Sequence, residues 1–599
     1  MIFRLFAALA ALAMAPGAVP ASQEPPIGMW VSKSVSAPAL TGTIVLSHEG
    51  LSWTASLRGQ RATGSARGGG LRIAFVRDGG EFRGLVAPDG RLTDGFWVQP
   101  PQGFGVLRQP FATPVALRQT GRGVWRGDIR PLADRFTLFL KIFREPDGTL
   151  IAALRNPEAN FNGGRAQFTV SRHGDDLQFV TRPAEGQRAI AFEGRIVDGA
   201  LSLKAPGLNH AFDLAPADPA TAAAFFPRPP GEPAYTYQPP VAADDGWRTA
   251  RAATVGLDES ALARIVQAEI DSDPAGKRPP LIHSILVARR GKLVLEEYFF
   301  GFDAKALHDT RSAAKTFNSV MLGAVMQADR GVGPESKIYN LMAGEGPFAN
   351  PDPRKAAISL EHLMTHTSGL ACDDNDDSSP GNEDAMQSQV KQPDWAKYTL
   401  DLPMAHDPGA RYAYCSANAN LVGAGLSART GLWLPVLFDR TIARPLQFGP
   451  YAWDLAPSGD GYGGGGMYLR PRDLLKIGQT YLDGGVWHGR RVVSADWVRR
   501  STDPRIDVSP ATTGLAPEAF SQVYNLARDG YAWHVNDLKV GDSIYRDYEA
   551  TGNGGQLLIV VPEADLAVVF TAGNYGQGGI WGRWRDQIVA QQIIPAIRP

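Results

Sequence analysis

Thr310-Arg311-Ser312-Ala313-Ala314-Lys315-Thr316-Phe317 is the stretch from which the fold of the C-terminal part of this chain can be predicted. A serine three residues before a lysine places both side chains on one face of a helix, one turn apart. The residues that follow show the apolar spacing of a helix buried along one side, and they are Phe317, Val320, Met321, Ala324, Val325 and Ala328. Gly331 is a stop signal. We therefore expect Ser312 to open a half-buried helix, with its backbone N–H near the positive end of the helix dipole.

A Ser-x-x-Lys pair on such a helix is suited to nucleophilic acyl transfer. A serine hydroxyl is a weak nucleophile until a neighbour takes its proton. A lysine takes a proton only when it is neutral, and burial lowers the pKa of an ammonium because a low dielectric disfavours its charge. Four letters prove little, since Ser388-Gln389-Val390-Lys391 matches the same pattern in a polar stretch without an apolar stripe. The hypothesis for Ser312 needs partners elsewhere in the chain.

Length and composition indicate an ordinary globular protein with several domains. The chain has 599 residues, of which 20% are charged and 44% hydrophobic. The net charge of -1 gives no basic surface for nucleic acid or for an anionic membrane. We expect a small-molecule ester, amide or peptide-like substrate rather than a nucleic-acid partner.

Residues 1–21 have the composition of a secretory signal. Arg4 supplies the charged start, an apolar run follows, and Val19-Pro20-Ala21 offers a small-residue cleavage site. A membrane anchor is the alternative, but the apolar run is too short to span a bilayer comfortably. The sequence therefore predicts cleavage near Ala21 and a periplasmic or secreted protein without a membrane span.

Residues 22–220 show β patterns. Short alternating runs are separated by Asp-Gly turns, and Gly28-Met29-Trp30 resembles Gly123-Val124-Trp125 in an imperfect repeat. This predicts two β-rich units, residues 22–115 and 116–220, in an accessory or packing role. The proline-rich residues 221–245 are then expected to form a semi-rigid linker.

Residues 246–599 show an α/β pattern. Strand-like runs occur near both ends of this region, at 284–295 and 556–571, and helical patterns lie between them. We expect one antiparallel sheet built from both ends of the domain and flanked by helices, with a helical subdomain inserted in the middle.

Two further stretches supply possible partners for Ser312. Tyr414 lies just before a helical pattern, and a tyrosine phenol near a lysine ammonium can relay a proton. Asn553-Gly554-Gly555-Gln556 runs into a strand, and its glycines allow a close backbone approach to a ligand. Ordinary packing of the tyrosine and a simple tight turn are the alternatives.

From about Gly256 to Ile597 the chain resembles the serine β-lactamase-related hydrolases, which include class C β-lactamases, D-alanyl-D-alanine carboxypeptidases and esterases. The segments 361–370 and 465–474 carry the likeness in addition to the stretches above. The resemblance implies that Ser312 is the acylated nucleophile, Lys315 its base partner and Tyr414 an aid to proton transfer. It implies a third motif at Asn553-Gly554-Gly555, an oxyanion hole from the N–H groups of Ser312 and Gln556, and no metal or organic cofactor.

Two departures from the family pattern bear on the substrate. Ser416 stands where the second motif usually has an asparagine, and Asn553 stands where β-lactamases have a lysine. Loss of that cation removes a partner for a substrate carboxylate and favours esters or amides. The resemblance is thus closest to the esterases and the 6-aminohexanoate-dimer hydrolases. A penicillin-binding carboxypeptidase or β-lactamase is the alternative enzyme, and a non-catalytic cell-envelope binding protein is the alternative of another class.

Other features of this region have plainer interpretations. His366 and Ser368 belong to a stretch that is a structural turn in the family. Asp373, Asn375 and Asp377 have the spacing of a calcium loop, but Ser378 takes the glycine position, so we interpret 373–384 as a solvated acidic loop.

Cys372 and Cys415 are the two cysteines of the chain, and each follows a motif expected beside the same pocket. With an export signal present, we predict that they form a disulfide. Two separate buried thiols are the alternative.

Overall fold

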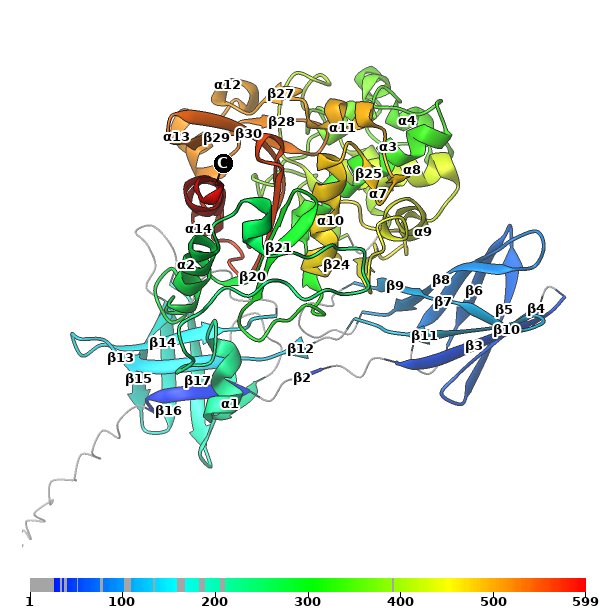
Figure 1. Cartoon of the computed structure of the whole chain (residues 1–599). Helices are drawn as coiled ribbons and strands as arrows, with labels where there is room; N and C mark the ends of the chain where they lie inside the picture. Colours follow the sequence, from blue (N-terminus) through cyan, green and yellow to red (C-terminus); the bar gives the residue numbers. More distant parts are fainter. Residues whose placement is uncertain are drawn as a thin grey trace, which may run out of the picture.

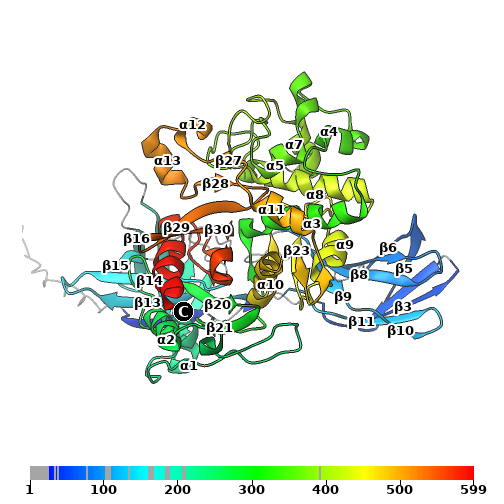
Figure 2. The same ribbon diagram turned by 45° about the horizontal axis from the view of Figure 1, so that its top comes forward.

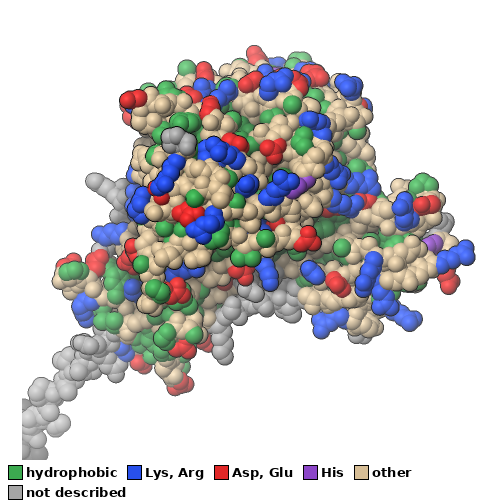
Figure 3. Space-filling view, in the orientation of Figure 1, with side chains coloured by type: hydrophobic (Ala, Val, Ile, Leu, Met, Phe, Trp, Pro, Cys, Tyr) green, Lys and Arg blue, Asp and Glu red, His purple; other side chains and the backbone are tan. Residues whose placement is uncertain are grey.

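The computed structural model describes residues 26–598, apart from 33–34, 37–39, 51, 76–78, 102–108, 133–134, 159–166, 182–188, 205–210 and 390–392. The predicted export signal at 1–21 lies outside these residues. Two β-rich units lie below a larger α/β domain, one on each side of it (Figure 1). Basic and acidic side chains are interspersed on the face shown in Figure 3, in keeping with the net charge of -1.

One β-rich unit is a closed eight-stranded barrel. Its strands, in order around the barrel, are β1 (Gly28–Ser32), β13 (Phe139–Arg144), β14 (Leu150–Arg155), β15 (Gln167–His173), β16 (Asp176–Thr181), β17 (Ala191–Val197), β18 (Ala200–Lys204) and β19 (Phe212–Pro216). Phe168, Phe179 and Phe192 are among the buried side chains of its core. An eight-stranded barrel is just wide enough for side chains to fill, so this interior is a packed core.

The other β-rich unit is an open antiparallel sheet. Its strands are β10 (Arg118–Gly121), β11 (Val124–Ile129), β3 (Gly42–Glu49), β4 (Ser52–Leu57), β5 (Gln60–Arg67), β6 (Gly70–Ala74), β7 (Glu81–Val86), β8 (Leu92–Gln99) and β9 (Phe111–Val115), in that order.

The two β-rich units exchange the first strands of the sequence repeat. Trp30 of β1 pairs with Leu140 in the barrel, whereas Trp125 of β11 pairs with Leu46 in the open sheet. The short strands β2 (Val35–Ser36) and β12 (Arg135–Phe136), which follow β1 and β11 along the chain, pair with each other. The boundary predicted between residues 115 and 116 therefore does not separate the two sheets. A local repeat marks which strands are alike, but it does not specify which copy each strand pairs with.

The open sheet continues into the C-terminal domain. β9 pairs with β23 (Ala452–Asp454), which is followed by β24 (Met467–Leu469) and β22 (His308–Asp309). Phe96 and Val98 of β8 belong to the same hydrophobic cluster as Phe317. The first β unit thus belongs to the same sheet as β22, which ends three residues before Ser312.

The C-terminal domain contains a second, eight-stranded antiparallel sheet. Its strands are β21 (Lys292–Tyr298), β20 (Ile282–Arg289), β32 (Leu566–Ala572), β31 (Gln556–Val561), β30 (Ser543–Gly552), β29 (His534–Val540), β28 (Arg528–Asp529) and β27 (Ile506–Asp507), in that order. Strands from both ends of the domain are neighbours because β20 pairs with β32.

Helices cover both faces of this sheet. α3 (Lys315–Ala328) and α10 (Pro471–Leu482) contribute to one buried cluster, whereas α2 (Glu259–Ile270) and the C-terminal helix η8 (Arg585–Ile593) contribute to the other. The middle of the domain forms a helical layer (Figure 2). It includes α4 (Ile338–Leu341), α5 (Leu360–Met364), α7 (Trp395–Asp401), α8 (Ser416–Thr430) and α9 (Leu434–Phe438).

The proline-rich segment 221–245 is anchored to the C-terminal domain. The Tyr237 hydroxyl donates to the Val294 carbonyl (2.6 Å), the Tyr235 hydroxyl donates to Glu297 (2.6 Å), and Asp245 pairs with buried Arg472 (3.0 Å). The predicted linker is therefore a strap held on the domain surface.

Among the described residues, no single helix is both long and apolar enough to cross a bilayer, although the bent pair Ser416–Thr430 and Leu434–Ala443 together has suitable length and composition.

Candidate active site

Ser312 lies on the turn that leads into α3. It belongs to the 3-10 turn η3 (Arg311–Ala314), and α3 begins at Lys315. The Lys315 Nζ lies 2.8 Å from the Ser312 Oγ and donates a second hydrogen bond to the Gly464 carbonyl (2.7 Å). Lys315 is 5% exposed, while Ser312 is partly open to solvent. The predicted pair is thus a buried amine beside an accessible hydroxyl.

The backbone just before Ser312 is strained. Arg311 has a φ of 48°, a left-handed conformation that non-glycine residues rarely adopt. Its N–H and guanidinium are both held by the Asp309 carboxylate (2.8 and 2.7 Å). Such strain is retained where surrounding contacts over-determine the backbone, and it is common at functional sites.

Tyr414 lies beside both Lys315 and Ser312. The Lys315 Nζ is 5.1 Å from the centre of the Tyr414 ring. His366 packs against the same ring, with centroids 4.7 Å apart, and its Nδ1 accepts the N–H of Cys415 (3.2 Å). Burial lowers the pKa of His366 to about 3, so it is neutral and serves to hold the Tyr414 loop.

The third-motif turn packs against the nucleophile turn. A Cβ at Gly552 would lie 2.3 Å from the Thr310 carbonyl oxygen, so only glycine allows this approach. Gly552 pairs with Gln556 across the β30–β31 hairpin, and the Gln556 side chain is held by Ala572 (2.6 and 3.2 Å). These contacts fix the Gln556 side chain in the sheet, and the role of its backbone N–H in an oxyanion hole stays a prediction.

The backbone N–H groups of Ser312 and Asn553 belong to the two turns that meet at this contact. No hydrogen bond from the N–H of Ser312 or of Asn553 is found within the described residues. Asn553 is the first residue beyond β30, and its side-chain oxygen accepts the N–H of Gly576 (2.8 Å). The Asn553 side chain thus faces Gly576, whereas its backbone N–H has no hydrogen-bond partner among the described residues.

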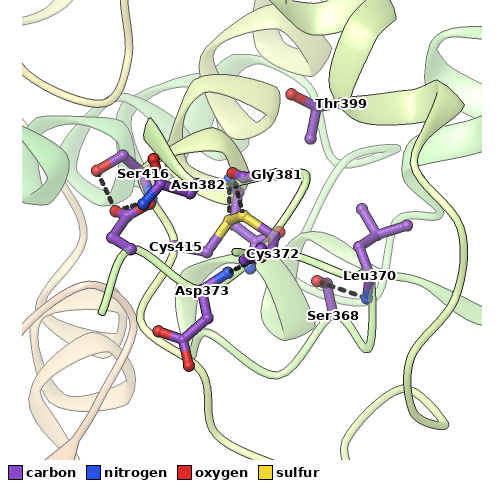
Figure 4. The surroundings of a disulfide bond; sticks show 12 residues. Ser368, Leu370, Cys372, Asp373, Gly381, Asn382, Thr399, Cys415 and Ser416 are labelled. Atoms are coloured by element: carbon purple, nitrogen blue, oxygen red, sulfur yellow. Dashed lines mark hydrogen bonds between the residues drawn. A yellow bond between two sulfur atoms is a disulfide. The ribbon is translucent and has the colours of Figure 1, made fainter. Parts of the chain in front are cut away.

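A disulfide joins the two cysteines beside this site. The Cα atoms of Cys372 and Cys415 are 5.7 Å apart, within the range that a disulfide requires. The Cys415 sulfur also accepts the N–H of Asn418 (3.2 Å), which caps α8. Figure 4 shows Ser416 next to this bridge. The bridge therefore lies between the predicted second motif and the acidic segment that follows Cys372.

Residues 283–579 match the model of the family described as Beta-lactamase. This part of the chain belongs to the β-lactamase family. The protein is accordingly a serine hydrolase. A 6-aminohexanoate-dimer hydrolase of Paenarthrobacter ureafaciens is 25% identical over 312 residues, which cover 48% of this chain and 71% of that protein.

Solved structures with a similar fold include a penicillin-binding protein homologue from Caulobacter crescentus and a family VIII carboxylesterase. The first is 13% identical, with a TM-score of 0.41, covering 52% of this chain and 91% of the other. The second is 15% identical, with a TM-score of 0.40, covering 53% and 92%.

In this β-lactamase-family domain, the charge on Lys315 differs from the expectation based on burial. Burial lowers the pKa of its ammonium, but Tyr414, Glu383 and Asp374 together raise it above its ordinary value. Burial also raises the pKa of the Tyr414 phenol, although Lys315 and Ser312 act in the opposite direction. The resting site therefore holds a cationic lysine and a neutral tyrosine.

The interpretation of 373–384 as a solvated loop is wrong for Asp374 and Glu383. Both are partly buried and act on the charge of Lys315, whereas Asn375, Asp376 and Asp377 are exposed. Their position could have been inferred from the cysteines, because a bridge from Cys372 to Cys415 brings the residues after Cys372 next to Tyr414. Within the described residues, no group of three or more His, Cys, Asp or Glu side chains is placed to hold a metal ion.

Proposed function

We propose that this protein is an exported serine hydrolase that cleaves ester or amide bonds by acyl transfer at Ser312. The observation that carries the proposal is the 2.8 Å contact between the Lys315 Nζ and the Ser312 Oγ, with Tyr414 against the same amine. A nucleophile, a proton acceptor and a third group that orients them are the parts that such catalysis requires.

Acylation starts with attack of the Ser312 Oγ on the substrate carbonyl carbon. The Lys315 ammonium first loses one proton. The Lys315–Tyr414 pair can then accept the proton of the Ser312 hydroxyl. The N–H groups of Ser312 and Gln556 stabilise the oxyanion that develops. Collapse of this intermediate breaks the bond to the alcohol or amine, which leaves with the proton from the pair.

Deacylation repeats these steps with water. Water attacks the acyl carbon of the Ser312 ester, the same pair accepts its proton, and the carboxylic acid leaves as Ser312 regains its hydrogen. Ser312, Lys315 and Tyr414 therefore carry out the proton transfers of both half-reactions.

The third motif supports a substrate without a carboxylate near the scissile bond. Asn553 replaces the lysine of β-lactamases, and its side chain is occupied by Gly576. Arg311 does carry a cation nearby, but Asp309 pairs with it and it lies over the Tyr575 ring (4.7 Å). A cation that is already paired is a poor partner for a further anion.

Export is supported by two features. Residues 1–21 have the composition of a secretory signal, and the Cys372–Cys415 bridge is of the kind that persists in oxidising compartments.

A hydrolysis panel tests this function. We expect short p-nitrophenyl esters to have a kcat/KM well above that of benzylpenicillin or of a D-Ala-D-Ala peptide, because Asn553 stands in place of the lysine and Arg311 is already paired with Asp309. The measurement is kcat/KM for each substrate, with Ser312→Ala as the control. A higher value for the β-lactam would replace the esterase assignment by a penicillin-binding one, and no turnover together with no labelling by a fluorophosphonate would favour a binding protein.

A further inference from the structure

The disulfide joins two short segments whose neighbouring residues, Asp374 and Ser416, form a partly buried hydrogen-bonded contact. Asp374 follows Cys372 by two residues. Ser416 directly follows Cys415, and Figure 4 shows both of them at the bridge. The Asp374 Oδ2 accepts both the backbone N–H of Ser416 (2.7 Å) and its hydroxyl (2.6 Å). Ser416 is the first residue of α8, so this carboxylate also lies at the N-terminus of a fifteen-residue helix.

Glu383 fixes the other side of Asp374. The Glu383 N–H donates to the Asp374 Oδ1 (2.9 Å) at the start of α6 (Glu383–Gln387). The Glu383 carboxylate accepts the Tyr462 hydroxyl and the Gln387 amide (3.2 Å). Because both oxygens of Asp374 are engaged, its carboxylate is held in one orientation.

These two carboxylates contribute to the charge state of Lys315. Together with Tyr414 they raise the pKa of the lysine against the effect of burial. Burial and Glu383 raise the pKa of Asp374 to about 6, while Lys315 and the contacts with Ser416 lower it. At neutral pH the Asp374 carboxylate and the Lys315 ammonium are therefore both charged, and each favours the charged form of the other.

The other titratable groups that face Lys315 leave this balance unchanged. His366, from the segment after α5, is neutral because burial lowers its pKa to about 3. His534, at the start of β29, is paired with Asp529 (2.5 Å), so any positive charge it carries is balanced by that carboxylate. The net negative charge near Lys315 comes from Asp374 and Glu383.

The contact with Asp374 also explains why the second motif tolerates a serine. Ser416 occupies the position where the family usually has an asparagine, and its hydroxyl points to Asp374. We propose that Asp374, backed by Glu383, is a positioning residue that replaces the missing asparagine. It holds the start of α8 and keeps the Lys315 ammonium beside Ser312 and Tyr414.

This inference rests on the proposed function and has a consequence for pH dependence. Lys315 must lose a proton before Ser312 can be activated, so kcat/KM is lost as the pH falls through the pKa of Lys315. Removing a carboxylate lowers that pKa, and the acidic limb of the profile moves to lower pH. A purely structural contact would change the rate or the stability without moving the limb.

The test compares the pH profiles of wild type, Asp374→Asn and Glu383→Gln on one uncharged ester. Asn keeps an oxygen that can accept from Ser416, so the substitution removes mainly the charge. We expect the acidic limb of kcat/KM to move to lower pH by about one unit in each variant, the effect typical of one nearby opposite charge. Asp377→Asn, the same change at an exposed position of the same segment, should give the wild-type limb.

Limbs that stay at the wild-type pH in both variants, or that move to higher pH, overturn the inference. If Asp374→Asn does not fold, Glu383→Gln decides alone, because its carboxylate acts on Lys315 without contacting Ser416. A wild-type protein that neither hydrolyses esters nor labels at Ser312 with a fluorophosphonate would refute the proposed function instead. A labelled, active wild type with unmoved limbs refutes only the role of the carboxylates.

Discussion

The Lys315 amine lies where it could accept the proton of Ser312, but its neighbours favour the charged ammonium form. Its amine contacts Ser312 and the Gly464 carbonyl, and acidic neighbours raise its pKa although it is 5% exposed. Helical spacing alone predicts the contact between the two side chains. The protonation state depends on Tyr414, Glu383 and Asp374, which lie about sixty to a hundred residues further along the chain.

Removal of either member of the Ser312–Lys315 pair should abolish most of the activity. We expect Ser312→Ala and Lys315→Ala each to lower kcat/KM by roughly three orders of magnitude or more, and the double variant to be little worse, because the two groups act as one unit. Steady-state kinetics on a p-nitrophenyl ester measure this. Full activity in Ser312→Ala would move the nucleophile to another serine.

The raised pKa of Lys315 predicts an alkaline optimum. The ammonium form dominates below that pKa and cannot accept the proton of Ser312, so kcat/KM for an uncharged ester should rise with pH through the neutral range. The measurement is a profile from pH 5 to 10, corrected for spontaneous hydrolysis. A plateau that is already complete at pH 6 would show that Lys315 is neutral in the resting enzyme.

At the scale of elements, the disulfide ties a segment with little apolar surface to the start of α8. It links Cys372 and Cys415 across a separation of 43 residues. Cys415 lies between Tyr414 and Ser416, so the bridge anchors the loop that carries Tyr414 covalently.

Loss of this bridge should affect both stability and activity. In the chain-entropy model a loop of this length contributes about 4 kcal/mol to the free energy of unfolding, and less where the folded state is strained. We expect a lower Tm and a lower kcat in the reduced protein and in a Cys372→Ser, Cys415→Ser double variant, measured by calorimetry and ester hydrolysis. Two titratable thiols in denatured, unreduced protein from the export compartment would rule the bridge out.

At the scale of the whole molecule, the first β unit and the catalytic domain form one structure. They share a sheet through β9 and β23, and they share ion pairs between one buried aspartate and two partly exposed arginines. Asp94, whose side chain is 1% exposed, accepts from Arg440 (3.1 Å) and Arg444 (2.7 Å) of the helical layer. The interface therefore depends on one buried charge from the β unit.

Asp94→Asn should weaken this interface. Burial raises the pKa of Asp94, but hydrogen bonds from Arg440 and Thr93 and the arginine charges hold it below its ordinary value. We expect the variant to lose about 1.5–3 kcal/mol of unfolding free energy at neutral pH, the range for a hydrogen bond to a charged group. Asparagine also tolerates the positive φ of 51° at this position.

The pH dependence of that loss has a defined sign. An aspartate with a depressed pKa stabilises the fold above its unfolded pKa, and this contribution disappears as the pH falls below the folded one. The difference between wild type and Asp94→Asn in chemical denaturation should thus shrink toward pH 3. Asp89→Asn, at a 63% exposed carboxylate of the same unit, serves as the control and should change stability little. A difference that stays constant with pH would contradict the role of the charge.

The sequence by itself determined the features that depend on short spacings: the Ser312–Lys315 contact, the strands at both ends of the catalytic domain, and the proximity of Gly552–Gln556 to a strand. These follow from helical and strand periodicity, which acts within a few residues. The tertiary structure alone decided that β1 and β11 change places between the β units, and that Tyr414, Glu383 and Asp374 act together on the charge of Lys315. Each of these depends on groups that are distant in the chain and meet only after folding, because hydrogen-bond pairing and electrostatic fields act through space and not along the sequence.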